Sequence, residues 1–174
     1  MSRACYALLS AIGVTALVAA PLQAQAQDAV AELVDGKTNP VGTAQLNQLG
    51  QGVQIVVAVS GLPAGKHALH IHETGECEPP FESAGGHFNP TGAEHGWDNP
   101  QGPHAGDLPN IYVGEGAVEI EYITDRVTLE DGDTSLFDDD GSAIVIHEGQ
   151  DDYVSEPAGD AGNRLACGVI EKSD

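Results

Sequence analysis

Histidines are the residues of this chain whose number and spacing point to chemistry. Six of its seven histidines and one aspartate fall at intervals that suit metal ligation; in chain order they are His70, His72, His87, His95, His104, Asp107 and His147. Three imidazoles with one carboxylate suit a closed tetrahedral zinc site, and imidazole nitrogens in tetragonal geometry suit copper. These side chains are one ligand short of filling two separate four-ligand sites. One imidazole would therefore have to bind a metal through each ring nitrogen.

Two of the candidate ligands belong to a predicted strand. His70 and His72 are two positions apart in residues 67–73, and side chains at this spacing in a strand point to the same face. His147, at the end of another predicted strand, is expected to complete the group. A single histidine is more often a core or surface residue than a ligand, so the prediction of metal binding rests on the whole set.

The segment 74–109 carries the remaining candidates. It is rich in glycine, proline and histidine, has no strand or helix period, and contains His87, His95, His104 and Asp107. Loops of this length are usually functional. Such a loop buries too little apolar surface to order itself, so a bound metal would offset its ordering entropy. The alternative for each residue taken alone is a solvated polar side chain.

Short alternating apolar runs separated by turn residues predict an all-β domain. About eight strands at this spacing favour a Greek-key flattened barrel or an immunoglobulin-like sandwich, with long metal-binding and active-site loops. The polar, glycine-rich segment 148–163 is the second expected loop. The predicted strands cover residues 29–34, 42–49, 53–59, 67–73, 111–113, 117–123, 143–147 and 164–170.

Residues 1–26 are predicted to be a cleaved secretory signal peptide, and residues 27–174 the mature domain. Arg3 gives a positive start, residues 7–20 are small and apolar, and Ala24-Gln25-Ala26 has the small-x-small cleavage pattern. The apolar run is short for a bilayer span, and Cys5 precedes it, which argues against a lipoprotein. We therefore expect a periplasmic or secreted protein without a membrane anchor.

Cleavage removes Cys5 and leaves Cys77 and Cys167 as the remaining cysteines. In an exported protein an even pair most simply means one disulfide, and the alternative is two free buried thiols. The bridge would span 90 positions, the difference between residues 167 and 77. A closed loop of that length is worth roughly 4–5 kcal/mol in the chain-entropy model.

Acidic residues dominate the chain, with 27 Asp and Glu against six Lys and Arg. Removing Arg3 with the signal leaves five basic residues against 27 acidic ones, a net charge of −22. Such a charge excludes nucleic acid as a natural partner and argues against anionic lipid surfaces. Solubility, including solubility in a saline environment, is the simplest explanation of the acidity.

Four motifs carry a family resemblance over the whole mature chain. They are His70-Ile71-His72-Glu73, the Gly85-Gly86-His87-Phe88-Asn89-Pro90 run, His104-Ala105-Gly106-Asp107-Leu108, and Arg164-Leu165-Ala166-Cys167-Gly168-Val169-Ile170. In this combination and order they resemble an exported bacterial Cu/Zn superoxide dismutase. The resemblance implies that superoxide is the substrate, converted to dioxygen and hydrogen peroxide. It leaves open whether the protein is a monomer or a homodimer.

The resemblance also implies a role for each motif residue. Copper would be bound by His70, His72, His87 and His147, and zinc by His87, His95, His104 and Asp107, with His87 as the bridging imidazolate. Asp151 matches a carboxylate that links ligands of both metals. Arg164 matches the arginine that attracts the anion beside copper, and Cys77 and Cys167 match an intrasubunit disulfide. His67 aligns with a structural histidine outside the sites.

Two departures from the family pattern stand out. Ala68-Leu69 replaces a common Gly-Phe pair, and segment 148–163 contains no lysine, although many relatives use lysines there to steer superoxide. The net charge therefore predicts slowed or unusually salt-dependent capture of the anion. Two other functions are alternatives: a periplasmic copper- or zinc-binding or metal-delivery protein, and a zinc hydrolase. The hydrolase needs an open zinc position, whereas the loop offers four ligands.

Overall fold

Alternating apolar residues build most of the sheet in the computed structural model, which describes residues 28–173. The strands are β1 (Ala29–Asp35), β2 (Pro40–Gln48), β3 (Val53–Val59), β4 (Gly65–His67), β5 (Leu69–His72), β6 (Ile111–Val113), β7 (Val118–Thr124), β8 (Ala143–His147) and β9 (Arg164–Lys172), and one 3₁₀ helix, η1, covers Glu82–Ala84. The predicted signal segment 1–26 lies outside the described residues. Within residues 28–173, no helix has the length and apolar character needed to cross a bilayer.

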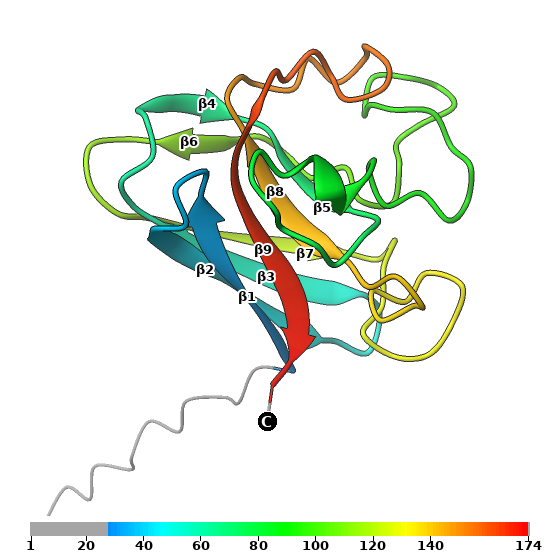
Figure 1. The fold of residues 1–174 in the computed structure, drawn as a ribbon. Coiled ribbons are helices and arrows are strands. Elements are labelled where there is room, and N and C mark those ends of the chain that lie inside the picture. Colours follow the sequence, from blue (N-terminus) through cyan, green and yellow to red (C-terminus); the bar gives the residue numbers. More distant parts are fainter. Residues whose placement is uncertain (1–27, 174) are drawn as a thin grey trace, which may run out of the picture.

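Seven strands form one antiparallel sheet in the order β5-β8-β9-β1-β2-β3-β7, and β4 pairs with β6 in a separate two-stranded sheet. The large sheet curls so that strands distant in sequence, such as β9 and β1, become neighbours (Figure 1). The prediction of an all-β fold is confirmed.

The core lies inside the curl of this sheet. In β3 the residues Val53, Ile55, Val57 and Val59 are buried and the residues between them are partly exposed, as expected for a strand with one core face. The main apolar cluster also contains Leu33 and further residues of β1, β2, β5, β8 and β9, and partly buried residues of β7 pack against it. Burial of this face provides the rigid frame on which the loops are mounted.

The predicted strand 67–73 is divided in the structure, which raises the strand count from the predicted eight to nine. Its first part, β4, pairs with β6, and its second part, β5, pairs with β8. The chain changes partner at Ala68, whose N–H donates to Gly149 O (2.8 Å) and whose carbonyl accepts from His147 N (2.9 Å). The division therefore occurs where the last residue of β8 and Gly149 of the loop that follows it satisfy the backbone of Ala68.

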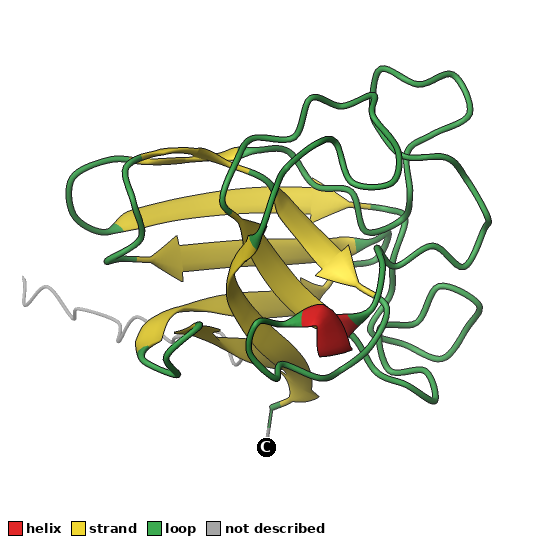
Figure 2. Cartoon of the chain, turned by 45° about the horizontal axis from the view of Figure 1, so that its top comes forward, coloured by secondary structure: helices red, strands yellow, loops and turns green. Residues whose placement is uncertain are grey.

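Strand β8 is buried on both faces. Ile144 and Ile146 join the main core, whereas Ala143 and Val145 join a second cluster with Phe81. The second cluster exists because the segment around η1 folds over the outer face of the sheet. The longer loops extend from the end of the sheet that lies nearer to η1, whereas shorter loops join strands at the other end (Figure 2). Segments 74–109 and 148–163 contain, apart from η1, no helix or strand among their described residues, as predicted.

Candidate metal centre

Strand β5 presents its two histidines to the loops rather than to the core. Leu69 and Ile71 enter the main cluster, so the alternation of the strand places His70 and His72 on the opposite face. On one edge β5 pairs with β8, which brings the end of that strand, His147, beside it. The predicted common face for the two histidines thus lies beneath the long loops.

The free edge of β5 is occupied by the long loop instead of a strand. Phe88 N donates to Ile71 O (2.9 Å), Ile71 N donates to Gly106 O (2.9 Å), and Gly106 N donates to Phe88 O (2.8 Å). Isolated bridges place His72 beside His87 and His70 beside Asp107. Backbone pairing therefore fixes the loop's ligand candidates against those of the strand.

Two groups of four side chains converge in this region. The ligand atoms of His70, His72, His87 and His147 lie within 4.8 Å of one another, and so do those of His87, His95, His104 and Asp107. All seven residues are buried. The structure thus brings together every metal ligand that the sequence predicted, and His87 is common to both groups.

The second group has the dimensions of a tetrahedral site. The Nδ1 atoms of His104 and His87 are 3.4 Å apart, and Asp107 Oδ1 lies 3.3 Å from His104 Nδ1 and 2.7 Å from His87 Nδ1. Ligands at zinc–nitrogen distances of about 2.0–2.1 Å are roughly 3.3 Å from each other in a tetrahedron. Asp107 Oδ2 accepts from the backbone N–H groups of Gly96 and His104 (3.0 Å each), which orients the carboxylate.

Three buried ring nitrogens have no hydrogen-bond partner among the described residues: His70 Nδ1, His87 Nε2 and His95 Nδ1. Unpaired buried polar atoms are rare in proteins and call for a ligand or ion. Each of these atoms belongs to a residue of the two groups, and His87, which is common to both, has its Nδ1 atom on Asp107 and its Nε2 atom buried without a partner. The donor set therefore fits one metal in each group.

Asp151 connects the two groups from behind. Its Oδ2 accepts from His70 Nε2 (2.9 Å) and its Oδ1 accepts from His95 Nε2 (3.0 Å). Each ring is thereby oriented with its Nδ1 atom toward its own group. A carboxylate in this position fixes the tautomer and the ring orientation of metal-binding histidines.

The charges of these groups follow from burial and from the two carboxylates. Burial lowers the pKa of His87 to about 4 and that of His147 to about 3, so both rings are neutral and available as ligands at neutral pH. Burial also lowers the pKa of His95, but the nearby carboxylates of Asp107 and Asp151, 3.1 Å and 3.0 Å from its two ring nitrogens, outweigh it and raise the pKa to about 10. For both carboxyls the same histidine contacts overcome desolvation and hold the pKa well below the usual range.

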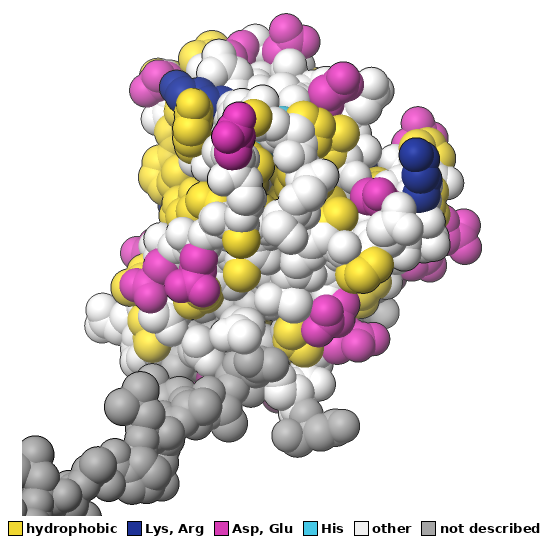
Figure 3. All heavy atoms as spheres, turned by 90° about the vertical axis from the view of Figure 1, so that its left-hand side faces the viewer, with side chains coloured by type: hydrophobic (Ala, Val, Ile, Leu, Met, Phe, Trp, Pro, Cys, Tyr) yellow, Lys and Arg dark blue, Asp and Glu magenta, His cyan; other side chains and the backbone are white. Residues whose placement is uncertain are grey.

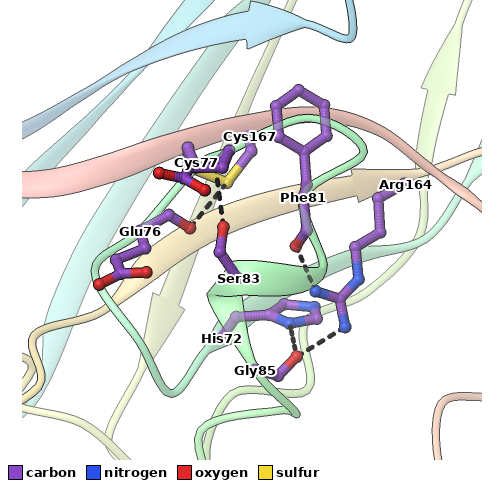
Figure 4. The surroundings of a disulfide bond; sticks show 9 residues. His72, Glu76, Cys77, Phe81, Ser83, Gly85, Arg164 and Cys167 are labelled. Carbon is purple, nitrogen blue, oxygen red and sulfur yellow. Dashed lines mark hydrogen bonds between the residues drawn. A yellow bond between two sulfur atoms is a disulfide. The ribbon is translucent and has the colours of Figure 1, made fainter.

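Arg164 lies at the opening of the first group. Its Nη2 donates to Gly85 O (2.6 Å) and its Nη1 donates to Phe81 O, while His72 Nδ1 donates to the same Gly85 oxygen (3.0 Å) (Figure 4). A cavity of about 320 Å³ is lined by Arg164 together with His72, His87, His147 and Glu156. A larger hollow of about 490 Å³ on the β4–β6 side is lined by residues that include Lys66, Tyr112 and Asp151. None of the seven candidate metal ligands lines it.

The predicted disulfide between Cys77 and Cys167 is present, with 5.7 Å between the Cα atoms. It ties the start of the long loop to β9, close to the segment that supplies the carbonyls for Arg164 (Figure 4). His67 lies outside both groups, and its ring nitrogens contact Pro63 O and His147 O.

Several residues that shape the centre were not predicted from the sequence. Glu156 Oε1 accepts from the backbone N–H of His95 (2.5 Å) and so joins the two loops. Gly159, at φ +65°, packs directly against Asp151 and the His95 ring, where a Cβ atom would collide with Asp151 Oδ1. The role of the Gly85 carbonyl could not be predicted, because a backbone oxygen is present in every residue. The glycines of segment 148–163, in contrast, did indicate a loop with unusual backbone angles.

Comparisons with known proteins agree with this geometry. The family model for copper/zinc superoxide dismutase (SODC) matches residues 40–170. Superoxide dismutase (Cu-Zn) 2 of Aquifex aeolicus is 52% identical over 144 residues, covering 80% of this chain and 84% of the relative. Superoxide dismutase (Cu-Zn) of Deinococcus radiodurans is 42% identical over 156 residues, covering 81% and 82%. The crystal structure of a SOD-like protein from Bacillus subtilis superposes with a TM-score of 0.77 at 40% identity, covering 80% of this chain and 96% of that one.

Proposed function

Because this chain belongs to the copper/zinc superoxide dismutase family, we propose that it disproportionates superoxide at a copper site joined to zinc through the His87 ring. The family is one of oxidoreductases, and copper and zinc are its cofactors. The observation that supports the bridging proposal is that His87 belongs to both ligand groups, with its Nδ1 atom on Asp107 and its Nε2 atom buried without a partner.

The proposed copper ligands are His70 Nδ1, His72 Nε2, His87 Nε2 and His147 Nε2, because the other nitrogen of three of these rings already donates to a protein oxygen. The proposed zinc ligands are the Nδ1 atoms of His87, His95 and His104 with a carboxylate oxygen of Asp107. All four zinc positions are then filled by protein, which is the pattern of a structural site.

In the proposed reaction two superoxide ions and two protons give one dioxygen and one hydrogen peroxide. Copper, when bound, supplies the one-electron exchange in which one superoxide is oxidised and the next reduced. Arg164 attracts and orients the anion at the cavity mouth, because two backbone carbonyls hold its guanidinium in place. His87 Nε2 is the nitrogen that takes up a proton in one half of the cycle and gives it up in the other.

Export is also part of the proposal. It rests on the composition of residues 1–26, which resembles a secretory signal, and on the disulfide, which suits an oxidising compartment. The intact mass of the protein recovered from its native host tests it. A mature chain that begins near Gln27 supports periplasmic or secreted location, whereas a chain that retains the first 26 residues contradicts it.

The alternative is a metal-binding or metal-delivery protein with the same fold. One observation favours this alternative: the solved structure of 40% identity belongs to a protein that is named only as SOD-like. Here both four-ligand groups and Arg164 are present, which favours the enzyme. Full loading with both metals and no superoxide turnover would support delivery instead.

The deciding experiment measures copper content, zinc content and superoxide turnover for the wild type, His147→Ala and His104→Ala. His147 belongs to the first group alone and His104 to the second alone, so the two variants control for each other. We expect His147→Ala to lose copper and turnover while zinc stays near one per chain. His104→Ala should lose zinc first. Unchanged turnover in His147→Ala would refute the site assignment.

A further inference from the structure

Arg126 contacts the long loop at two points, although it belongs to the segment that follows β7. Its Cζ atom lies 4.2 Å from the centroid of the Trp97 ring, within the range of a cation–π contact. Its Nη2 atom donates to the backbone carbonyl of Asp107 (2.8 Å). One guanidinium thus joins an aromatic ring of the loop to the peptide of a proposed zinc ligand.

The two contact points lie on either side of His104 and close to His95 in the sequence. Trp97 is two residues after His95, and His104 lies between Trp97 and Asp107. Gly96 N also donates to Asp107 Oδ2 (3.0 Å), so the turn before Trp97 and the carboxylate are already linked. Arg126 therefore closes a small unit that holds three of the four proposed zinc ligands.

The Asp107 peptide is held from the opposite side by the sheet. Gly106 O accepts from Ile71 N of β5 (2.9 Å), while Asp107 O accepts from Arg126. A backbone fixed on both sides leaves the carboxylate little freedom to turn. Sites held in their productive geometry before binding lose less entropy when the ligand arrives.

The guanidinium of Arg126 is partly buried, which is unfavourable for a charged group. Its Nε atom is buried without a hydrogen-bond partner among the described residues, and burial lowers its pKa against the opposing charges of Asp125 and Asp107. Burying a cation costs free energy unless contacts compensate. The two compensating contacts both go to the zinc loop.

We propose that Arg126 is a positioning residue for the zinc site: it clamps Trp97 and the Asp107 peptide so that the ligands of the long loop are arranged before the metal binds. This inference rests on the zinc half of the proposed function. It predicts that loss of the clamp weakens zinc binding and alters ligand geometry. A role in packing alone would lower the melting temperature of the metal-free protein without changing either.

The test compares Arg126→Ala, Arg126→Lys and the wild type in copper-free protein. Lys172→Ala is the matched control. Lys172, the last residue of β9, has its Nζ atom 4.8 Å from the centroid of the Phe137 ring, and this cation–π pair lies outside the ligand groups. Zinc affinity is measured by competition with a chromophoric chelator. The visible absorption spectrum of the Co²⁺-substituted protein reports the geometry of the ligands.

We expect Arg126→Ala to bind zinc about tenfold more weakly, as for other residues that support metal ligands from behind, and to show a changed Co²⁺ spectrum. Arg126→Lys should fall between, because an ammonium cannot stack flat on Trp97 while donating to Asp107 O. Lys172→Ala should match the wild type in both measurements. Equal zinc affinity and an identical spectrum in Arg126→Ala would overturn the inference.

Two further outcomes separate this inference from the proposal it rests on. If the wild type itself binds no zinc at one per chain, the zinc site is wrong. If Arg126→Ala does not fold, Trp97→Leu removes the ring beneath the guanidinium and leaves the hydrogen bond to Asp107 O. Weaker zinc binding by Trp97→Leu supports the clamp, and wild-type affinity in that variant overturns it.

Discussion

At the scale of single residues, most histidine rings of the centre have one nitrogen bonded to a protein oxygen and the other free to bind a metal. His70 and His95 use Nε2 for Asp151, and His72 and His147 use Nδ1 for backbone carbonyls. The other nitrogen of each is left for the metal, so the protein determines which atom binds. His87 differs, because it belongs to both ligand groups and only its Nδ1 atom contacts a protein oxygen, that of Asp107.

Gly159 tests the importance of the Asp151 contact. We expect Gly159→Ala to weaken the binding of both metals and to lower the melting temperature, because its Cβ atom would collide with Asp151 Oδ1 and crowd His95 Nε2. Gly92→Ala is the matched control: Gly92 has φ +67° against +65° for Gly159, but has no neighbouring atom within 4 Å of an added Cβ. Both variants carry the positive-φ strain of about 1 kcal/mol, and only Gly159→Ala should lose metal. Equal metal retention would contradict the role of Asp151.

The buried histidines predict that the metal-free protein loses stability in mild acid. His87 and His147 have native pKa values of about 4 and about 3 because burial disfavours their charged forms. Between these values and 6.5 the unfolded chain binds protons that the native state does not, so the free energy of unfolding falls as pH falls. The effect is about 2 kcal/mol per ring by pH 5. His95, whose pKa is raised to about 10, is protonated in both states well below pH 6.5 and adds no slope there.

Thermal unfolding of chelator-stripped protein between pH 7.5 and pH 4.5 measures this effect. We expect a steady fall of the melting temperature below pH 6.5 and a nearly flat profile for the copper- and zinc-loaded protein until the metals leave, because a metal-bound nitrogen cannot take a proton. A melting temperature that stays constant or rises in the stripped protein would contradict the prediction.

At the scale of the elements, the sequence predicted the strands better than their partners. The alternation of apolar residues in 53–59 and the position of His70 and His72 on one face follow from local periodicity, and the structure shows both. The change of partner at Ala68 and the pairing of the long loop with β5 depend on backbone groups of distant residues, which leave no periodic signal. The metal ligands were predictable because their side-chain types and spacing are visible in the sequence. The roles of the Gly85 carbonyl and of Arg126 were not predictable, because they depend on contacts with residues far away in the chain.

The disulfide joins the stability of the long loop to the placement of Arg164. Cys77 is followed by Phe81 and Gly85, whose carbonyls hold the guanidinium, and Cys167 lies on the same strand as Arg164. We expect the double variant Cys77→Ser, Cys167→Ser to lose up to about 4–5 kcal/mol of stability. Turnover per bound copper should also fall several-fold, because the carbonyls that orient Arg164 are no longer tethered to β9.

Guanidinium unfolding and turnover normalised to copper content check the two parts of this prediction separately. Zinc content serves as the internal control, because the proposed zinc ligands all follow residue 86. A variant that is destabilised yet turns over at the wild-type rate per copper would show that Arg164 is held without the tether.

At the scale of the whole molecule, the acidic surface opposes an anionic substrate. The chain carries 27 acidic residues against six Lys and Arg, and one face shows acidic side chains in several separate groups with few basic ones (Figure 3). The cavity itself is lined by Glu73 and Glu156 beside Arg164. Arg164 is thus the local attraction within a repulsive long-range field, which salt screens over about 10 Å at 0.1 M.

The salt dependence of the proposed reaction follows from this balance. Screening weakens the long-range repulsion more than the contact with Arg164, so we expect the second-order rate of superoxide consumption to stay level or rise between 10 and 200 mM salt.

Asn163→Lys, which adds a positive charge next to Arg164 in an exposed position, should raise the rate several-fold at low salt and make it decrease with added salt. Gln51→Lys is the control, because it adds the same charge in the exposed turn between β2 and β3 and should change the rate little. Pulse radiolysis measures these rates directly. A wild-type rate that falls steeply with added salt would mean that the field at the cavity is attractive despite the net charge.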